Sequence, residues 1–117
     1  MNQLYMKIIV ILLIIMGEGF SIYAEMIAAK SHAGSILTQT FLKMLIIVVI
    51  AGGFLILGYV LGYSVFKNIW VVSVASITSI LIIEPILAYT IFNQLPTRGA
   101  LIGLILGALG FISALFF

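Results

Sequence analysis

The chain has 117 residues, of which 65% are hydrophobic and only 7% are charged, and its formal net charge is +2. About a quarter of the residues of a soluble domain are charged, so this composition excludes an ordinary water-soluble fold. The Lys and Arg residues are scattered singly, which excludes a basic patch for nucleic acid. Cysteine is absent, which excludes disulfides and thiolate zinc sites. We expect the whole chain, 1–117, to form one domain whose partner is the lipid bilayer.

Four apolar segments follow one another along the chain, separated by short polar links. Each is long enough to cross a hydrocarbon core of about 30 Å as a helix that rises about 1.5 Å per residue. None of them alternates polar and apolar residues as the strands of a membrane barrel do. The sequence therefore predicts an all-α fold, an integral membrane bundle of four transmembrane helices. The expected helices are residues 4–29, 41–66, 69–92 and 99–117.

The ends of the segments indicate how the chain crosses the membrane. The first segment resembles a secretory signal with a cleavage site after Ala24, but we interpret it as an uncleaved helix. The link Lys67-Asn68 is so short that the second and third helices must be antiparallel neighbours. Lysine and arginine are divided two against three between the two sides, which is a weak bias. The chain thus either has a single orientation, with the first and third links in the cytoplasm, or inserts both ways and pairs antiparallel with itself.

Glu18 is the first candidate for a substrate- and proton-binding residue. A carboxylate at the centre of a bilayer costs about 2.5 to 3.5 kcal/mol on insertion scales, so such a residue normally faces a cavity or the bundle interior. Glu18 lies mid-way along its segment between Gly17 and Gly19, which would let a substrate or a neighbouring backbone approach closely. A carboxylate that exchanges a proton for a cation is the minimal device for proton-coupled transport. The alternative is a protonated side chain that only hydrogen-bonds a neighbouring helix.

Glu25 and Glu84 are the other two candidates for substrate or proton binding. Glu25 shares a helix face with Glu18 about two turns nearer the membrane surface. There it would either gate the site or pair with Lys30 as an interfacial charge. Glu84 precedes Pro85, which removes a helical hydrogen bond and predicts a kink in the third helix. Glu84 would either bind a ligand or lie in a polar seam beside this kink.

Glycines recur at intervals of four residues in two of the segments. This spacing flattens one face of a helix and allows close packing, either inside the bundle or across a dimer. The sequence alone does not distinguish the two. The glycines concerned are Gly58 and Gly62 in the second segment and Gly99, Gly103 and Gly107 in the fourth.

The end of the chain carries a pattern that is similar to a known family. The run Ile83-Glu84-Pro85-Ile86-Leu87-Ala88 is followed by a polar turn at Asn93-Gln94 and then by Leu101-Ile102-Gly103. This order resembles the last two helices of the repeat unit in the drug/metabolite transporter superfamily, in particular its four-helix small multidrug resistance-like and half-size EamA-like members.

The resemblance implies roles for particular residues. Glu18 lies roughly where the small multidrug resistance proteins have their essential glutamate, which binds substrate and protons alternately. In the third segment, a group of hydroxyl residues replaces the tyrosine and tryptophan that face the substrate in that family; these are Ser73, Ser76, Thr78 and Ser79. The fourth segment resembles the glycine-bearing motif through which those proteins dimerise. The residues expected in dimer or helix packing are Gly103, Leu104, Leu106, Gly107 and Gly110.

These observations together predict a small dimeric transporter in a bacterial inner membrane that moves a small organic solute or cation, coupled to protons. Its partner would be a second copy or a similar small membrane protein. The alternatives are a flippase subunit for a polyprenyl-linked sugar and a non-transporting subunit of a larger membrane complex. The sequence has no nucleophile–base pair, phosphate loop or metal cluster, so we expect no enzymatic activity, no metal and no cofactor.

Overall fold

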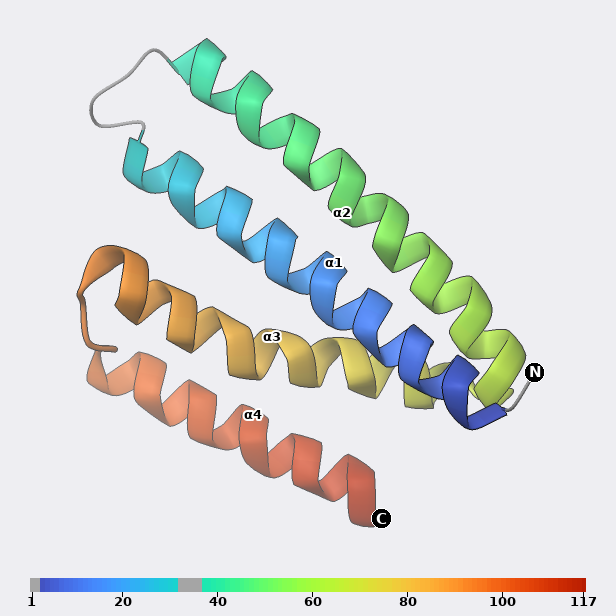
Figure 1. Cartoon of the computed structure of the whole chain (residues 1–117). Coiled ribbons are helices and arrows are strands. Elements are labelled where there is room, and N and C mark those ends of the chain that lie inside the picture. Colours follow the sequence, from blue (N-terminus) through green and yellow to red (C-terminus); the bar gives the residue numbers. More distant parts are fainter. Residues whose placement is uncertain (1–2, 32–36) are drawn as a thin grey trace.

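The computed structural model describes residues 3–31 and 37–117, which form four helices (Figure 1). All four helices are long and apolar enough to cross a membrane, so the predicted all-helical fold is confirmed. In chain order the helices are α1 (Gln3–Ser31), α2 (Leu37–Phe66), α3 (Ile69–Phe92) and α4 (Arg98–Phe116).

The helix ends agree with the sequence-based bounds except around the first link. Helix α1 continues to Ser31, and α2 begins at Leu37 rather than near Phe41. The three polar residues 38–40 are therefore helical, because a polar side chain does not by itself interrupt the backbone hydrogen bonds of a helix. The rest of the first link, residues 32–36, lies outside the described part of the chain.

The other two links are closed by local capping. Lys67 has the left-handed backbone conformation (φ 57°), and the Asn68 side chain accepts a hydrogen bond of 2.9 Å from the backbone N–H of Trp70. At the far end of α3, Asn93 is also left-handed (φ 55°), and Thr97 caps the start of α4. Asn tolerates this conformation well, and Asn and Thr both supply the side-chain oxygen that a helix start requires. The polar links thus end one helix with a left-handed residue and start the next with a side-chain cap.

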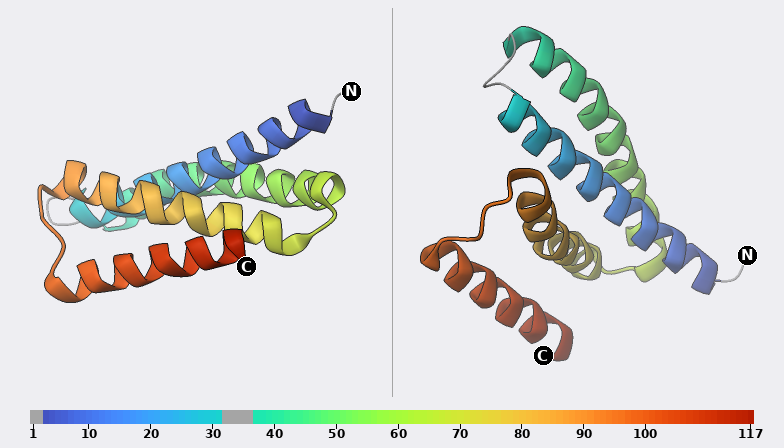
Figure 2. Two further views of the ribbon diagram at one scale, coloured as in Figure 1. Left: turned by 90° about the horizontal axis from the view of Figure 1, so that it is seen from below. Right: turned by 60° about the vertical axis from the view of Figure 1, so that its left-hand side comes forward.

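The helices are arranged as an antiparallel hairpin, α1 with α2, onto which α3 and then α4 are added (Figure 1). Helix α3 packs mainly on α1 and less on α2, whereas α4 packs mainly on α3 and lies at the edge of the molecule (Figure 2). The molecule extends 48 × 34 × 17 Å along its principal axes. It is therefore flat, and the four helices do not surround a common core.

The buried core lies where α1, α2 and α3 meet. Val10, Ile14 and Val72 have at most 1% of their surface exposed and form one cluster. Two glycines of α2 face this cluster. An added Cβ would lie 2.9 Å from Ile14 Cγ1 at Gly58, and 2.9 Å from Val72 Cγ2 at Gly62. The glycine spacing in α2 therefore serves packing inside the chain.

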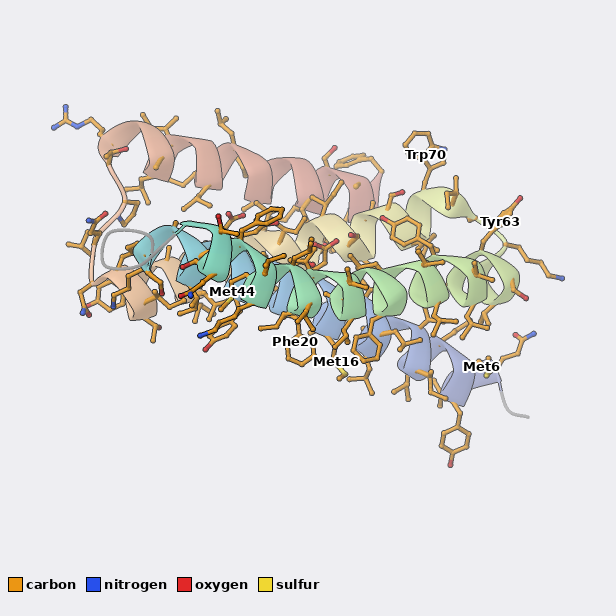
Figure 3. The ribbon with its side chains drawn as sticks, turned by 90° about the horizontal axis from the view of Figure 1, so that it is seen from above. Met6, Met16, Phe20, Met44, Tyr63 and Trp70 are labelled. Atoms are coloured by element: carbon orange, nitrogen blue, oxygen red, sulfur yellow. The ribbon has the colours of Figure 1, made fainter. Side chains whose placement is uncertain are left out.

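The outer faces of the helices are apolar. Met16 of α1 and Trp70 of α3 project away from the helices (Figure 3), and 75% of the Trp70 surface is exposed. None of the residues of α4, all of which are described, is buried. Such a surface suggests an integral membrane protein, because monomeric soluble proteins rarely expose apolar area of this extent.

Candidate functional site

A hydrogen bond between α1 and α3 connects Glu18 to Ser76. The Ser76 hydroxyl donates to Glu18 Oε1 over 2.5 Å. Ser76 is buried, with 5% of its surface exposed, and Glu18 is half-buried. The first candidate from the sequence therefore lies in an interface between two helices rather than on the outer surface.

The two glycines beside Glu18 face different neighbouring helices. A Cβ added at Gly17 would lie 2.6 Å from Leu55 Cγ of α2, and one added at Gly19 would lie 3.6 Å from Ile83 Cδ1 of α3. Gly17 therefore lets α2 approach, whereas Gly19 is in ordinary contact with α3. A close approach is therefore seen at Gly17, where an added Cβ would also lie 3.1 Å from the Ala51 carbonyl oxygen of α2, and is not seen at Gly19.

Ser76 is the hydroxyl residue of α3 that reaches another helix. Ser79 is equally buried but donates to the Ala75 carbonyl of its own helix over 2.9 Å, and Thr78 donates to the Val74 carbonyl over 2.6 Å. Such bonds to the preceding turn satisfy a hydroxyl within an apolar helix. In the sequence, Ser76 is one of several similar hydroxyl residues in this region. Its partner could not be recognised without the relative rotation of α1 and α3.

A second polar contact joins the ends of α1 and α3. The Lys30 ammonium donates a hydrogen bond of 2.7 Å to the Ile91 carbonyl, which is one of the last carbonyls of α3 and has no partner within the helix. Between this contact and Glu18, Glu25 is exposed and lines neither of the two pockets described next. Glu25 therefore takes no part in the two pockets.

Two pockets open beside α3. The larger, of about 690 Å³, lies between α1, α3 and α4; Thr78 and Ser79 contribute hydroxyl groups to a wall that is otherwise largely apolar. The smaller, of about 500 Å³, lies between α3 and α4 and contains Glu84. Glu18 lines neither of these two pockets, and its side chain is half-buried between α1 and α3.

Glu84 is exposed on α3 and belongs to the smaller pocket. The adjacent Pro85 lies inside α3, and the helix continues through it to Phe92. Glu84 and Glu18 are therefore held in different places, one between α3 and α4 and the other between α1 and α3. Within residues 3–31 and 37–117, no hydrogen bond joins any two of the three glutamates.

The expected packing residues of α4 divide into two groups. A Cβ at Gly107 would lie 2.9 Å from Leu81 Cδ2 of α3, whereas a Cβ at Gly103 or Gly110 would meet nothing within 4 Å. Leu106 is also open, with 63% of its surface exposed, and Leu104 is half-buried at the smaller pocket. Gly107 thus serves the contact with α3, and the face that carries Gly103, Leu106 and Gly110 is uncovered.

Comparison with known proteins adds no assignment. No protein-family model, curated protein or solved structure matches this chain. Across residues 3–31 and 37–117, no three His, Cys, Asp or Glu side chains gather into a group that could hold a metal ion. The function has to be argued from the site itself.

Proposed function

We propose that this chain is an integral protein of a bacterial inner membrane and acts as a dimeric, proton-coupled transporter of a small organic solute or cation. Glu18 would be the group that carries the proton and the substrate in turn. The observation on which this rests is the hydrogen bond from Ser76 to Glu18, a carboxylate held between two helices near the middle of α1.

The membrane location is supported by the surface and by the lengths of the helices. Each helix is long and apolar enough to span, and large apolar side chains are exposed on all of them. Backbone groups within helices are satisfied internally, as lipid requires. The flat arrangement that exposes α4 is stable in lipid, where apolar surfaces need no cover.

The coupling role of Glu18 is supported by the cost of placing a carboxylate there. Glu18 is one residue from the centre of α1, where an unpaired charge costs about 2.5 to 3.5 kcal/mol on insertion scales. One hydroxyl donor compensates only part of this cost, so a proton or a cationic substrate would complete the site. Binding of an organic cation to the protonated site releases one proton, and rebinding of a proton releases the cation.

The dimer is supported by the uncovered face of α4. Small residues on one helix face allow two helices to approach closely in a membrane, and Gly103 and Gly110 are open on this face. Transporters of known architecture place their site between two repeats near the midplane. If one chain corresponds to one such repeat, a second copy packed on α4 would supply the other repeat.

The test is proton release by the purified full chain in detergent. We expect organic cations to release protons from the wild type, Glu18→Asp to retain release because it keeps the carboxylate, and Glu18→Gln to abolish it. Release that persists in Glu18→Gln would refute the role of Glu18. Release by lipid-phosphate sugars alone would favour a flippase subunit. Silence with every ligand, together with copurification of a larger partner, would favour a non-transporting subunit.

A further inference from the structure

The smaller pocket combines an unpaired carboxylate with aromatic and apolar walls. It has a volume of about 500 Å³, which is within the range of about 300 to 1,000 Å³ typical of small-molecule sites. It is formed by α3, by the link 93–97 and by the first turns of α4. Glu18 is not part of it, so whatever it holds is bound away from the proposed coupling site.

Glu84 supplies the charge of this pocket. Neither a hydrogen bond nor an ion pair reaches its carboxylate within the described residues, 3–31 and 37–117. Lys30, whose ammonium lies at the last turn of α3, is already bonded to the Ile91 carbonyl. Glu84 lies eight residues before the end of α3, so it is about 12 Å from that end of the helix. If α3 spans the bilayer as proposed above, a bare carboxylate at this depth is costly, and a cation at this position would lower the cost.

The walls around Glu84 suit an organic cation rather than a metal ion. Tyr89 and Phe92 line the same pocket, and aromatic rings attract ammonium groups through their π faces. Leu81 and Leu104 supply apolar contacts on the two helices. A divalent metal ion favours several carboxylate or carbonyl oxygens around it, whereas Glu84 is the one charged residue that lines this pocket and the Thr97 hydroxyl already caps α4.

Gly103 keeps one wall of the pocket open. It belongs to the pocket lining, and a Cβ at this position would meet nothing within 4 Å. A larger side chain there would occupy space that a ligand needs. The same helix has a matched position, Gly110, which is equally open but does not line the pocket.

From these observations we infer that the α3–α4 pocket binds an amphipathic monoamine, with the ammonium group on Glu84 and the apolar part against the pocket walls. The site is distinct from Glu18 and opens near the end of α3, where a molecule that partitions into the outer region of a bilayer would arrive. The inference rests on the membrane placement proposed above and not on transport.

The test is binding of 4-fluorophenethylammonium, observed by ¹⁹F NMR line broadening with the full chain in nanodiscs of uncharged lipid. Empty nanodiscs correct for partition into lipid, and the neutral 4-fluorophenethyl alcohol reports binding without charge. The measurement is made in the wild type and repeated in Glu18→Gln. In the second background, a site at Glu18 does not contribute to amine binding. We expect Glu84→Gln to weaken amine binding about tenfold, the size of a hydrogen bond to a charged group, and Glu84→Asp to weaken it less.

The second variant pair tests the walls independently of the charge. Gly103→Leu should weaken amine binding, whereas Gly110→Leu should not, although both change the same face of α4.

Equal binding of the amine and the alcohol would overturn the inference and indicate a lipid-chain pocket. Amine binding that survives Glu84→Gln but is lost in Glu18→Gln would overturn it while leaving the proposed function intact. Absence of binding in a dimer whose second copy covers Glu84 would also overturn it.

Discussion

The ammonium group of Lys30 donates to the carbonyl oxygen of Ile91 and connects the last turns of α1 and α3. These helices also share the bond between Ser76 and Glu18 nearer their middle. The pair is therefore held by one polar contact at the proposed coupling site and by another at one end. The two contacts differ in character, because the first uses a carboxylate and a hydroxyl and the second an ammonium and a backbone carbonyl.

Lys30→Met should loosen the ends of α1 and α3. The variant keeps a long apolar side chain but removes the cation from a helix C-terminus, a contact worth about 0.3 to 1 kcal/mol. Hydrogen–deuterium exchange in the last turn of α3 should become about two- to fivefold faster, which corresponds to that energy. Lys43→Met, at another exposed lysine, is the control. Equal acceleration in both variants would show that the Lys30 contact does not hold the helix end.

Ser76→Ala should destabilise the protein more than Ser79→Ala. Both hydroxyls are almost fully buried, but the Ser76 hydroxyl bonds to Glu18 of another helix and that of Ser79 to its own helix. Hydrogen bonds between membrane helices contribute about 0.6 to 2 kcal/mol, so the difference in unfolding free energy should lie in this range. Unfolding in mixed detergent micelles measures it. Equal losses would mean that the bond between Ser76 and Glu18 contributes nothing to stability.

Gly62→Ala should be destabilising, whereas Gly53→Ala in the same helix should be neutral or stabilising. A Cβ at Gly62 would lie 2.9 Å from Val72 Cγ2 and 3.0 Å from Val10 Cγ1, and these two valines are fully enclosed. Overpacking of this kind costs about 1 to 3 kcal/mol. At Gly53 a Cβ would meet nothing within 4 Å. A Gly62→Ala variant as stable as Gly53→Ala would show that α1, α2 and α3 can move apart at no cost.

Cysteine substitution on the uncovered face of α4 should reveal the proposed dimer. The chain has no cysteine, so an introduced thiol is the only one that can form a disulfide. Oxidation of Gly110→Cys in membranes should give a covalent dimer on a denaturing gel. Val49→Cys, on an exposed face of α2, should give much less. A higher yield of covalent dimer from Val49→Cys than from Gly110→Cys would show that the copies contact each other through α2 rather than α4.

The sequence by itself determined the helices. Long apolar runs form helices because local hydrogen bonding satisfies the backbone, and polar links such as Lys67-Asn68 end them through capping. For this reason the predicted third helix, 69–92, has the bounds that the structure shows. The largest difference is at the start of the second helix, which was predicted near residue 41 and begins at Leu37. Glu18 could also be selected as a candidate, because its position near the middle of an apolar segment is visible in the sequence.

The tertiary structure decided which residues meet. The glycine spacing is similar in α2 and α4, yet Gly62 packs on the core and Gly103 faces open space. Ser76 and Ser79 are alike in the sequence, but only Ser76 turns toward Glu18. Glu84 lies in a different pocket from Glu18. These differences depend on the rotation and offset of one helix against another, which arise from side-chain packing between distant segments and leave no local pattern in the chain.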